Sequence, residues 1–225
     1  VHGLVEFDIT KTRETLRKHN LASGETLSFT AFFLDCLGRA VDTDRHIHAY
    51  RDWRNRLVLF DDLDVNMLFE VEIDGRKMIR PHILRGVNRM NTREIQTEID
   101  DFKNSHAESG ESKFIDWFVR VPGFVRRMFF SVLFKNPKLI KQYYGTVIVS
   151  SISMFGSGSG WAIPVPNHTL QITLGGVGEK PGVINHRVEP RTMMSVTVSF
   201  DHDIVDGAAV ARFIQRLKKL VETGV

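Results

Sequence analysis

Hydrophobic and polar positions alternate along this chain with two different periods, and the shorter period marks strands. In "RTMMSVTVSF" (191–200), Met194, Val196, Val198 and Phe200 fall on one face, with mostly small polar residues between them. Successive side chains of a strand point to opposite faces, so this segment predicts a strand with one buried face. Similar patterns predict further strands at 4–9, 56–60, 64–73, 77–83, 145–155 and 169–178.

The longer period marks helices. One apolar stripe of helical spacing consists of Val210, Phe213, Ile214, Leu217 and Val221. Together with weaker stripes elsewhere it predicts helices at 11–20, 29–41, 91–102 and 207–222.

The first three of these helices carry start signals. Ser28 and Thr10 each precede a predicted helix and can cap its first turn. Asn91 and Glu94 have the spacing of a capping box, in which each side chain bonds to the other residue's backbone N–H.

Strands and helices are interleaved without a strict βαβ period, and no internal repeat is visible. This order predicts an α/β fold, a two-layer α-β sandwich with a mixed β-sheet, rather than a doubly wound fold. The chain has 225 residues, of which 42% are hydrophobic, so it can bury a sizeable core. We expect a single domain over residues 1–225.

Residues 113–141 are unusually rich in aromatic and basic side chains. They hold seven aromatic residues, seven Lys or Arg and one acidic residue. Pro122–Gly123 should divide this helical insertion into two helices. Such a stretch can bind a membrane surface. We favour helices that cover a sheet edge or a subunit contact, because aromatic residues are also enriched at protein interfaces.

Charge and cysteine content exclude several classes of protein. The net charge is only +3, which does not indicate a nucleic-acid-binding protein, although the pI near 9.1 is compatible with an anionic ligand. The single cysteine, Cys36, excludes an internal disulfide and a Cys-based zinc site. Its apolar surroundings indicate a core residue rather than a nucleophile. This composition favours a reducing, cytoplasmic setting.

Membrane-spanning and targeting segments are not apparent. No run of about 18 apolar residues is present, so no spanning helix is predicted. No signal peptide is visible. The chain begins with Val1 rather than Met, so the lack of a visible signal peptide says little about any segment that precedes it.

Two candidate ligand-binding patterns have the wrong spacing. "GSGSG" (156–160) follows a strand, but no Gly-Lys-Ser/Thr follows it and two prolines block an immediate helix, which indicates a turn rather than a phosphate loop. His202 and Asp206 are four residues apart, yet the positions between them cross a bend and no third ligand is nearby. No metal site is predicted, and no residues indicate a cofactor-binding set.

Taken singly, neither His202 nor Asp206 indicates catalysis. Asp206 stands directly before "GAAVARF" and is well placed as the N-cap of the last helix. Most histidines in loops are simply solvated.

The sequence around these two residues adds a further observation. "SFDHDIVDGAAVARFIQRLKKLVE" (199–222) places His, three residues and Asp-Gly between a final strand and an amphipathic helix. It resembles the C-terminal signature of the acyltransferase catalytic domain of 2-oxoacid dehydrogenase complexes, a family that shares its fold with chloramphenicol acetyltransferase. Segments 4–19, 64–102 and 144–156 resemble earlier parts of that domain in the same order. The likeness covers most of the chain, except about 104–143.

The resemblance implies roles for particular residues. His202 would be the catalytic histidine, and Asp206 would organise its loop. Ser150 would hydrogen-bond the oxyanion of the tetrahedral intermediate, with Ser151 as the alternative if the register slips by one. In the family the active site lies between subunits of a trimer, which implies a homotrimer or larger homo-oligomer in which His202 and Ser150 can come from different chains.

The resemblance also implies a reaction and partners. We expect a CoA-dependent acyltransferase that moves a short acyl group between CoA and a thiol such as dihydrolipoamide. The lipoyl group would be carried on a separate domain or protein, with dehydrogenase components as further partners. A neutral imidazole can accept a thiol proton as the thiol attacks, so the reaction requires no acyl-enzyme.

Two departures keep alternatives open. Asp203 follows His202 where the dehydrogenase-complex enzymes usually carry Arg, and no lipoyl domain is visible in the sequence. One alternative is a stand-alone small-molecule O- or N-acetyltransferase of the same fold. The other is a non-catalytic trimeric scaffold.

Overall fold

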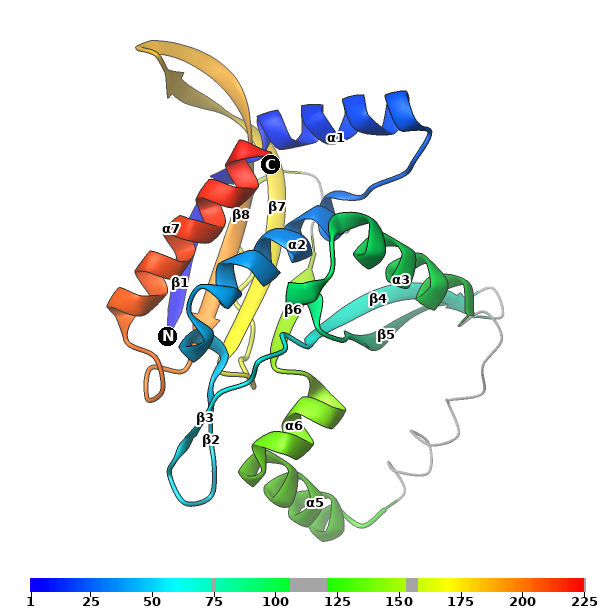
Figure 1. The fold of residues 1–225 in the computed structure, drawn as a ribbon, viewed down its shortest axis with the longest axis vertical. Coiled ribbons are helices and arrows are strands. Elements are labelled where there is room, and N and C mark those ends of the chain that lie inside the picture. The colour runs from blue at the N-terminus through cyan, green and yellow to red at the C-terminus, as the bar shows by residue number, and fades with distance from the viewer. Residues whose placement is uncertain (74–75, 106–120, 153–157, 225) are drawn as a thin grey trace.

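A six-stranded sheet forms the centre of the computed structural model, which describes residues 1–73, 76–105, 121–152 and 158–224 (Figure 1). The strand order is β1-β8-β7-β6-β4-β5. Strand β6 runs parallel to β4 and β7, and the other neighbours are antiparallel. The bounds of the strands are His2–Asp8 (β1), Val65–Ile73 (β4), Arg76–Leu84 (β5), Val147–Ser151 (β6), Leu170–Ile184 (β7) and Arg187–Phe200 (β8).

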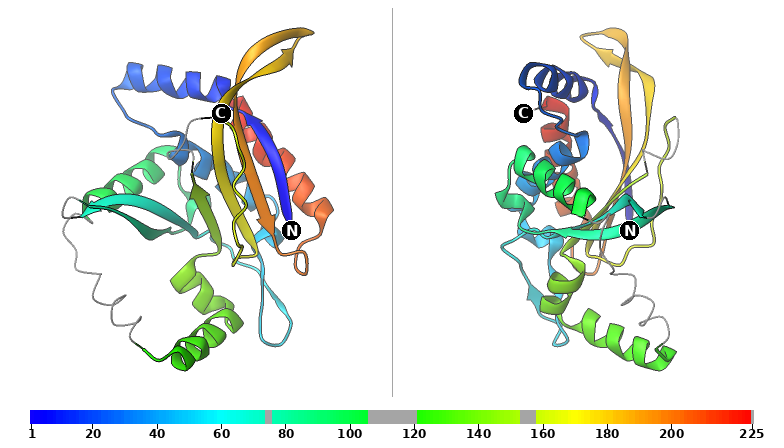
Figure 2. Two further views of the ribbon diagram at one scale, coloured as in Figure 1. Left: turned by 180° about the vertical axis from the view of Figure 1, so that it is seen from behind. Right: turned by 90° about the vertical axis from the view of Figure 1, so that its right-hand side faces the viewer.

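Helices cover one face of this sheet, as the side view in Figure 2 shows. The arrangement confirms the predicted α/β fold with a mixed sheet. The covering helices are α1 (Thr10–Ser23), α2 (Phe29–Asp42), α3 (Thr92–Ser105) and α7 (Gly207–Thr223). Shorter elements connect them, namely the 3-10 helices η1 (Arg45–His48) and η2 (Val87–Arg89) and the hairpin of β2 (Tyr50–Arg51) and β3 (Leu57–Val58). Among the described residues, no helix combines the length and apolarity needed to cross a bilayer.

The main core lies between the sheet and these helices. On β8, Val196, Val198 and Phe200 are buried as the alternation predicts, and they belong to the same cluster as Phe213 and Leu217 of α7. Cys36 is fully buried in α2, and desolvation raises the pKa of its thiol to about 12. The thiol is therefore inert core, as the sequence indicates.

The other face of the sheet is polar along its middle. Side chains that share a register position point to the same face, and Thr197 of β8 lies opposite Thr173 of β7, which lies opposite Ser150 of β6. Segment 158–168 runs along this face (Figure 2). An isolated bridge between Gly160 and Gly176 and a hydrogen bond of 3.0 Å from Trp161 Nε1 to the Val5 carbonyl hold that segment to the sheet.

Of the start signals predicted for α1, α2 and α3, those of α2 and α3 are confirmed. Ala31 donates its backbone N–H to Ser28 Oγ at 3.1 Å. Asn91 and Glu94 form the capping box, with Glu94 N to Asn91 Oδ1 at 3.0 Å and Asn91 N to Glu94 Oε2 at 2.8 Å. Thr10 is not the cap of α1 but its first residue, and its hydroxyl donates to Asp8.

Strand boundaries differ more from the sequence pattern. Strands β7 and β8 continue beyond the predicted ends into a long hairpin, closed by Asn185 and His186 with positive φ of 49° and 64°. Two prolines and a glycine obscure the alternation there, since Pro181 pairs with Pro190. The strand predicted at 56–60 is only Leu57–Val58, and the one at 145–155 ends at Ser151 in the described residues.

The aromatic and basic segment forms two described helices, α5 (Gly123–Lys135) and α6 (Pro137–Tyr144). The start of α5 directly after Pro122 agrees with the predicted division, and residues 113–120 lie outside the described residues. Ile140 of α6 packs with Tyr50 and Phe60 in a small second cluster. Helix α5 packs chiefly against α6, at the end of the molecule away from α1 (Figure 1).

Replacing Gly38 by Ala should destabilise the protein. A Cβ at this α2 position would lie 2.8 Å from Asn88 Cα and 3.0 Å from the Val87 carbonyl oxygen, so backbone would have to move. Overpacking typically costs about 1–3 kcal/mol, which exceeds the roughly 1 kcal/mol that Ala gains over Gly in a helix. Urea denaturation measures the difference. The control Gly123→Ala, with space around it, should not lose stability.

Candidate active site

The loop between β8 and α7 bends sharply around the carbonyl and side chain of Asp201. The backbone N–H groups of Ile204 and Val205 donate to the Asp201 carbonyl at 3.1 and 3.0 Å, and Asp203 N donates to Asp201 Oδ1 at 3.0 Å. The Asp201 N–H in turn donates to the Thr169 carbonyl at 2.9 Å. His202 is therefore held on a hydrogen-bonded turn rather than on a mobile tail of the strand.

Asp206 closes the loop from the other side. Its Oδ1 accepts the Ala209 N–H at 2.7 Å, which makes it the N-cap of α7 as predicted. A Cβ built on Gly207 would lie 3.9 Å from His202 Nε2, so the imidazole lies beside the start of α7. The ring of Phe200 is 5.8 Å from the His202 ring, centroid to centroid.

Arg51 contacts the loop that carries His202, and the sequence analysis did not predict this contact. Its guanidinium, on the short strand β2, donates to the carbonyl of Asp203. The two residues are 152 positions apart, so no local pattern could indicate this contact. Asp203 takes part in these loop hydrogen bonds through its backbone carbonyl and its backbone N–H. The presence of Asp at this position, where the family usually has Arg, therefore leaves these bonds unaffected.

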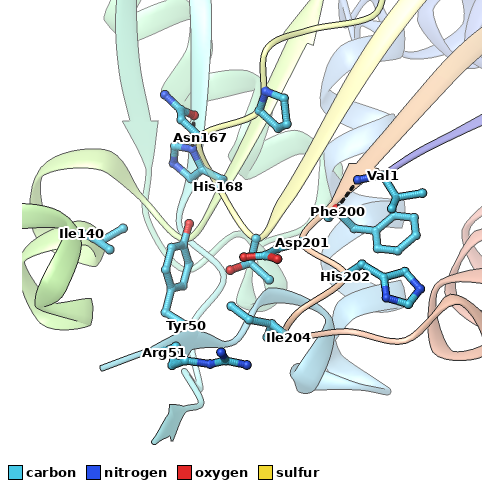
Figure 3. Close-up of a pocket in the computed structure, with 12 residues that line it drawn as sticks. Val1, Tyr50, Arg51, Ile140, Asn167, His168, Phe200, Asp201, His202 and Ile204 are labelled. Atoms are coloured by element: carbon cyan, nitrogen blue, oxygen red, sulfur yellow. Dashed lines mark hydrogen bonds between the residues drawn. The ribbon is translucent and has the colours of Figure 1, made fainter. Parts of the chain in front are cut away.

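A cavity of about 450 Å³ opens beside His202 (Figure 3). Its wall combines apolar and polar side chains, among them Tyr50, Ile140, His168, Phe200, Asp201 and Ile204. The Asp201 carboxylate points toward the space in front of Tyr50, while the His202 ring lies at the edge of the cavity (Figure 3).

Two other histidines of this region, His168 and His48, are buried. His168 Nε2 donates to the Tyr144 carbonyl at 3.0 Å, and burial lowers the pKa of its imidazole. His48 is within 3.1 Å of the Thr146 hydroxyl through Nδ1, and burial lowers the pKa of its imidazole to about 4. Both rings are neutral at physiological pH and act as structural side chains.

Ser150 is not brought to His202 within one chain. It lies on β6, two strands from β8, and its register partner on β8 is Thr197, five positions before His202. At strand spacings of about 4.8 Å and rises of about 3.3 Å per residue, the two Cα atoms are roughly 19 Å apart. The structure thus unites His202 with Asp206 and leaves Ser150 elsewhere on the sheet.

The polar sheet face around Ser150 holds several buried oxygen atoms without a hydrogen-bond partner among the described residues. Buried polar groups are normally paired, so these atoms indicate a place where water or a polar ligand completes the bonding. They belong to Asn66, Gln171, Thr173, Ser195 and Thr197. Thr173 stands directly beside Ser150 in register, and the sequence did not single it out.

The sequence analysis also weighed a metal site and a phosphate loop. In the described part of the chain, no group of three or more His, Cys, Asp or Glu side chains could hold a metal ion. Of the "GSGSG" turn, residues 156–157 lie outside the described residues, and Gly160 bridges to the sheet.

The sequence of the same region matches a known family. Residues 139–224 match the family model described as 2-oxoacid dehydrogenases acyltransferase (catalytic domain). This part of the chain is similar to that catalytic domain. The predicted resemblance is confirmed, and the match contains Ser150, His202 and Asp206.

Curated proteins extend this likeness over nearly the whole chain. The dihydrolipoyllysine-residue acetyltransferase component of the pyruvate dehydrogenase complex of Mycoplasma capricolum is 23% identical over 96% of this chain and 43% of its own length. The human mitochondrial dihydrolipoyllysine-residue succinyltransferase component of the 2-oxoglutarate dehydrogenase complex is 26% identical over 92% of this chain and 38% of its own length. The chain therefore spans about two fifths of the length of these relatives.

Solved structures confirm the fold. A probable dihydrolipoamide acetyltransferase from Listeria monocytogenes superimposes with a TM-score of 0.72 at 16% identity, covering 100% of this chain and 84% of that one. Chloramphenicol acetyltransferase gives a TM-score of 0.56 at 13% identity, covering 98% and 87%. The predicted chloramphenicol acetyltransferase-like sandwich is thus correct.

Removing the cap at Asp206 should weaken both the helix and the loop. Asp206→Ala leaves the Ala209 N–H without its partner, and cap losses of this kind cost about 1 kcal/mol of unfolding free energy. Asp206→Asn keeps a capping oxygen and should be close to the parent protein. Urea denaturation of the three proteins decides this point. Equal losses in both variants would mean that the carboxylate charge, not the cap, is what matters.

His48 should make stability depend on pH in the acidic range. The folded protein does not protonate His48 until about pH 4, whereas the unfolded chain takes up that proton near pH 6.5. The unfolding free energy therefore falls as pH decreases from 6.5 to 4, by up to about 3 kcal/mol from this residue. Denaturation at a series of pH values should show a shallower fall for His48→Gln. His46→Gln, at an exposed position, should retain the fall of the parent.

Proposed function

We propose that this chain is the catalytic domain of a CoA-dependent acyltransferase that moves a short acyl group between CoA and a thiol such as dihydrolipoamide. The observation that carries the proposal is His202 on the hydrogen-bonded turn between β8 and the Asp206-capped helix, within the segment that matches the family. In this proposal residues 1–225 are one domain, with the aromatic and basic helices of about 113–141 as an insertion.

His202 serves as general base. A free thiol with a pKa near 8.5 is only a few per cent ionised at neutral pH, whereas a free imidazole, with a pKa near 6.5, is mostly neutral and can accept a proton. In the forward step the imidazole takes the proton of the acceptor thiol while its sulfur attacks the thioester carbonyl carbon. The tetrahedral intermediate then expels CoA thiolate, which receives that proton, so the enzyme ends unchanged.

Ser150 donates a hydrogen bond to the oxyanion of the intermediate. A positioned hydroxyl is most effective where charge develops, and removing one such donor typically costs about 10²–10³-fold in rate. The unpartnered oxygens of neighbouring Thr173 and Thr197 support a polar ligand or water at this face. The alternative donor Ser151 points to the other sheet face by the alternation of the strand.

The active unit in this proposal is an oligomer, with a trimer as the minimum. Since Ser150 and His202 are roughly 19 Å apart within one chain by strand spacing, the site is complete only when His202 of one subunit meets Ser150 of its neighbour. Asp206 organises the histidine loop by capping α7, and Arg51 positions the loop through the Asp203 carbonyl.

Partners and setting follow from the same proposal. The acyl donor or acceptor on the protein side is a lipoyl group carried on a separate domain or protein, and dehydrogenase components supply the acyl group. A cytoplasmic setting is consistent with a chain whose single cysteine is a buried, inert thiol.

The enzymatic test is thiol release from acyl-CoA in the presence of dihydrolipoamide. His202→Ala should lower kcat/KM by about 10²–10⁴-fold, because general-base catalysis contributes that much. Ser150→Ala should lower it by about 10²–10³-fold with little change in KM. Ser151→Ala is the matched control and should stay near the parent rate. An unchanged rate in His202→Ala would remove this histidine from the mechanism.

A mixing experiment tests the shared site. His202→Ala and Ser150→Ala chains, co-expressed with different tags and purified through both, should regain activity well above either homo-oligomer. One type of interface in such mixtures holds an intact His202 and an intact Ser150. No recovery in a verified mixed oligomer would place both residues in a single-chain site.

A further inference from the structure

Helix α5 carries an exposed face that the proposed acyl transfer does not use. At 100° per residue, Phe124, Arg127, Met128, Ser131 and Lys135 share one side of the helix, opposite the buried Leu133. Phe124 and Met128 are 75% and 64% exposed. Large apolar side chains on an outward stripe indicate an interaction surface rather than a folding requirement.

The charged residues of α5 and α6 are all basic. Residues 121–144 contain five Lys or Arg and no Asp or Glu. Of these five, Lys141 pairs with Asp62, whereas Arg127 and Lys135 form no ion pair with another described residue. The occupant that complements such a surface is anionic.

The position and length of α5 indicate which kind of anionic partner fits this surface. Helix α5 lies at one end of the molecule (Figures 1 and 2), and Phe124, Arg127 and Met128 line a hollow of about 660 Å³ on its outward side. With 13 residues it is about 20 Å long, which is too short to span a bilayer but suited to lie in its interface. Aromatic and apolar side chains flanked by cations on one helix are typical of interfacial helices.

We propose that the α5 surface, defined by Phe124, Arg127, Met128 and Lys135, docks the protein peripherally on an anionic lipid surface. Phe124 and Met128 enter the boundary between headgroups and acyl chains. Arg127 and Lys135 bind lipid phosphates from the same side of the helix. The sequence alone favoured helices that cover a sheet edge or a subunit contact. Among the described residues, α6 joins the small cluster with Tyr50 and Phe60 through Ile140.

Sedimentation with vesicles tests the proposal with the intact chain. Binding should be strong to vesicles in which phosphatidylglycerol replaces a third of the phosphatidylcholine, weak to phosphatidylcholine alone, and reduced by added salt. Arg127→Gln/Lys135→Gln should weaken binding to the anionic vesicles by about thirtyfold, since each surface cation contributes about a factor of five. Phe124→Ser/Met128→Ser should weaken it by at least about tenfold.

Matched controls come from α1. Leu21→Ser removes another exposed apolar side chain, 79% exposed, and Lys11→Gln removes another exposed cation. Both should leave vesicle binding unchanged, and all variants should keep the far-UV circular dichroism and thiol-release rate of the parent. Equal loss in the α1 and α5 variants, or binding that does not distinguish the two vesicle types, would overturn the proposal.

Two further outcomes would assign the surface to something else. If the protein ignores anionic vesicles but binds polyglutamate through Arg127 and Lys135, the occupant is an acidic protein and the lipid proposal is wrong. If Phe124→Ser/Met128→Ser changes the oligomeric state by light scattering, the α5 surface is a contact between copies of this chain, which equally overturns the lipid proposal.

Discussion

Burial of Val196, Val198 and Phe200 on β8 fixes the register of the central sheet. A slip by one residue would turn these side chains away from the helices, at a cost of about 1.5–3 kcal/mol for each, and would bring polar side chains into the core. With the register fixed, Thr197 stays beside Thr173 and therefore in line with Ser150. The position of the proposed oxyanion donor is thus a consequence of hydrophobic burial on the opposite face of the same strands.

The same constraint fixes the position of His202. Strand β8 ends at Phe200 and α7 begins at Gly207 behind its Asp206 cap, so only a short turn can join them. The turn satisfies its backbone through Asp201 and through Arg51, which reaches it from β2. A histidine in such a turn is held by the ends of two well-packed elements, which is the rigid support that a general base requires.

The sequence predicted those features of the structure whose interacting residues lie close together in the chain. The Asn91–Glu94 box and the Asp206 cap depend on residues three positions apart. The contact of Arg51 with the histidine turn and the distance between Ser150 and His202 depend on strand order, which no local pattern contains. The β7–β8 hairpin was underestimated because Pro181 and Pro190 face each other where alternation would normally mark strands.

Helix α6 connects the two surfaces to which function is assigned. Ile140 lines the cavity beside His202 and also packs with Tyr50 and Phe60, while α5 packs against the same helix. Because packed interiors transmit displacements rather than absorbing them, the position of α5 and the shape of the cavity wall are coupled through α6. A protein docked through α5 would therefore have α6, and with it the part of the cavity wall that Ile140 forms, directly beside the docked helix.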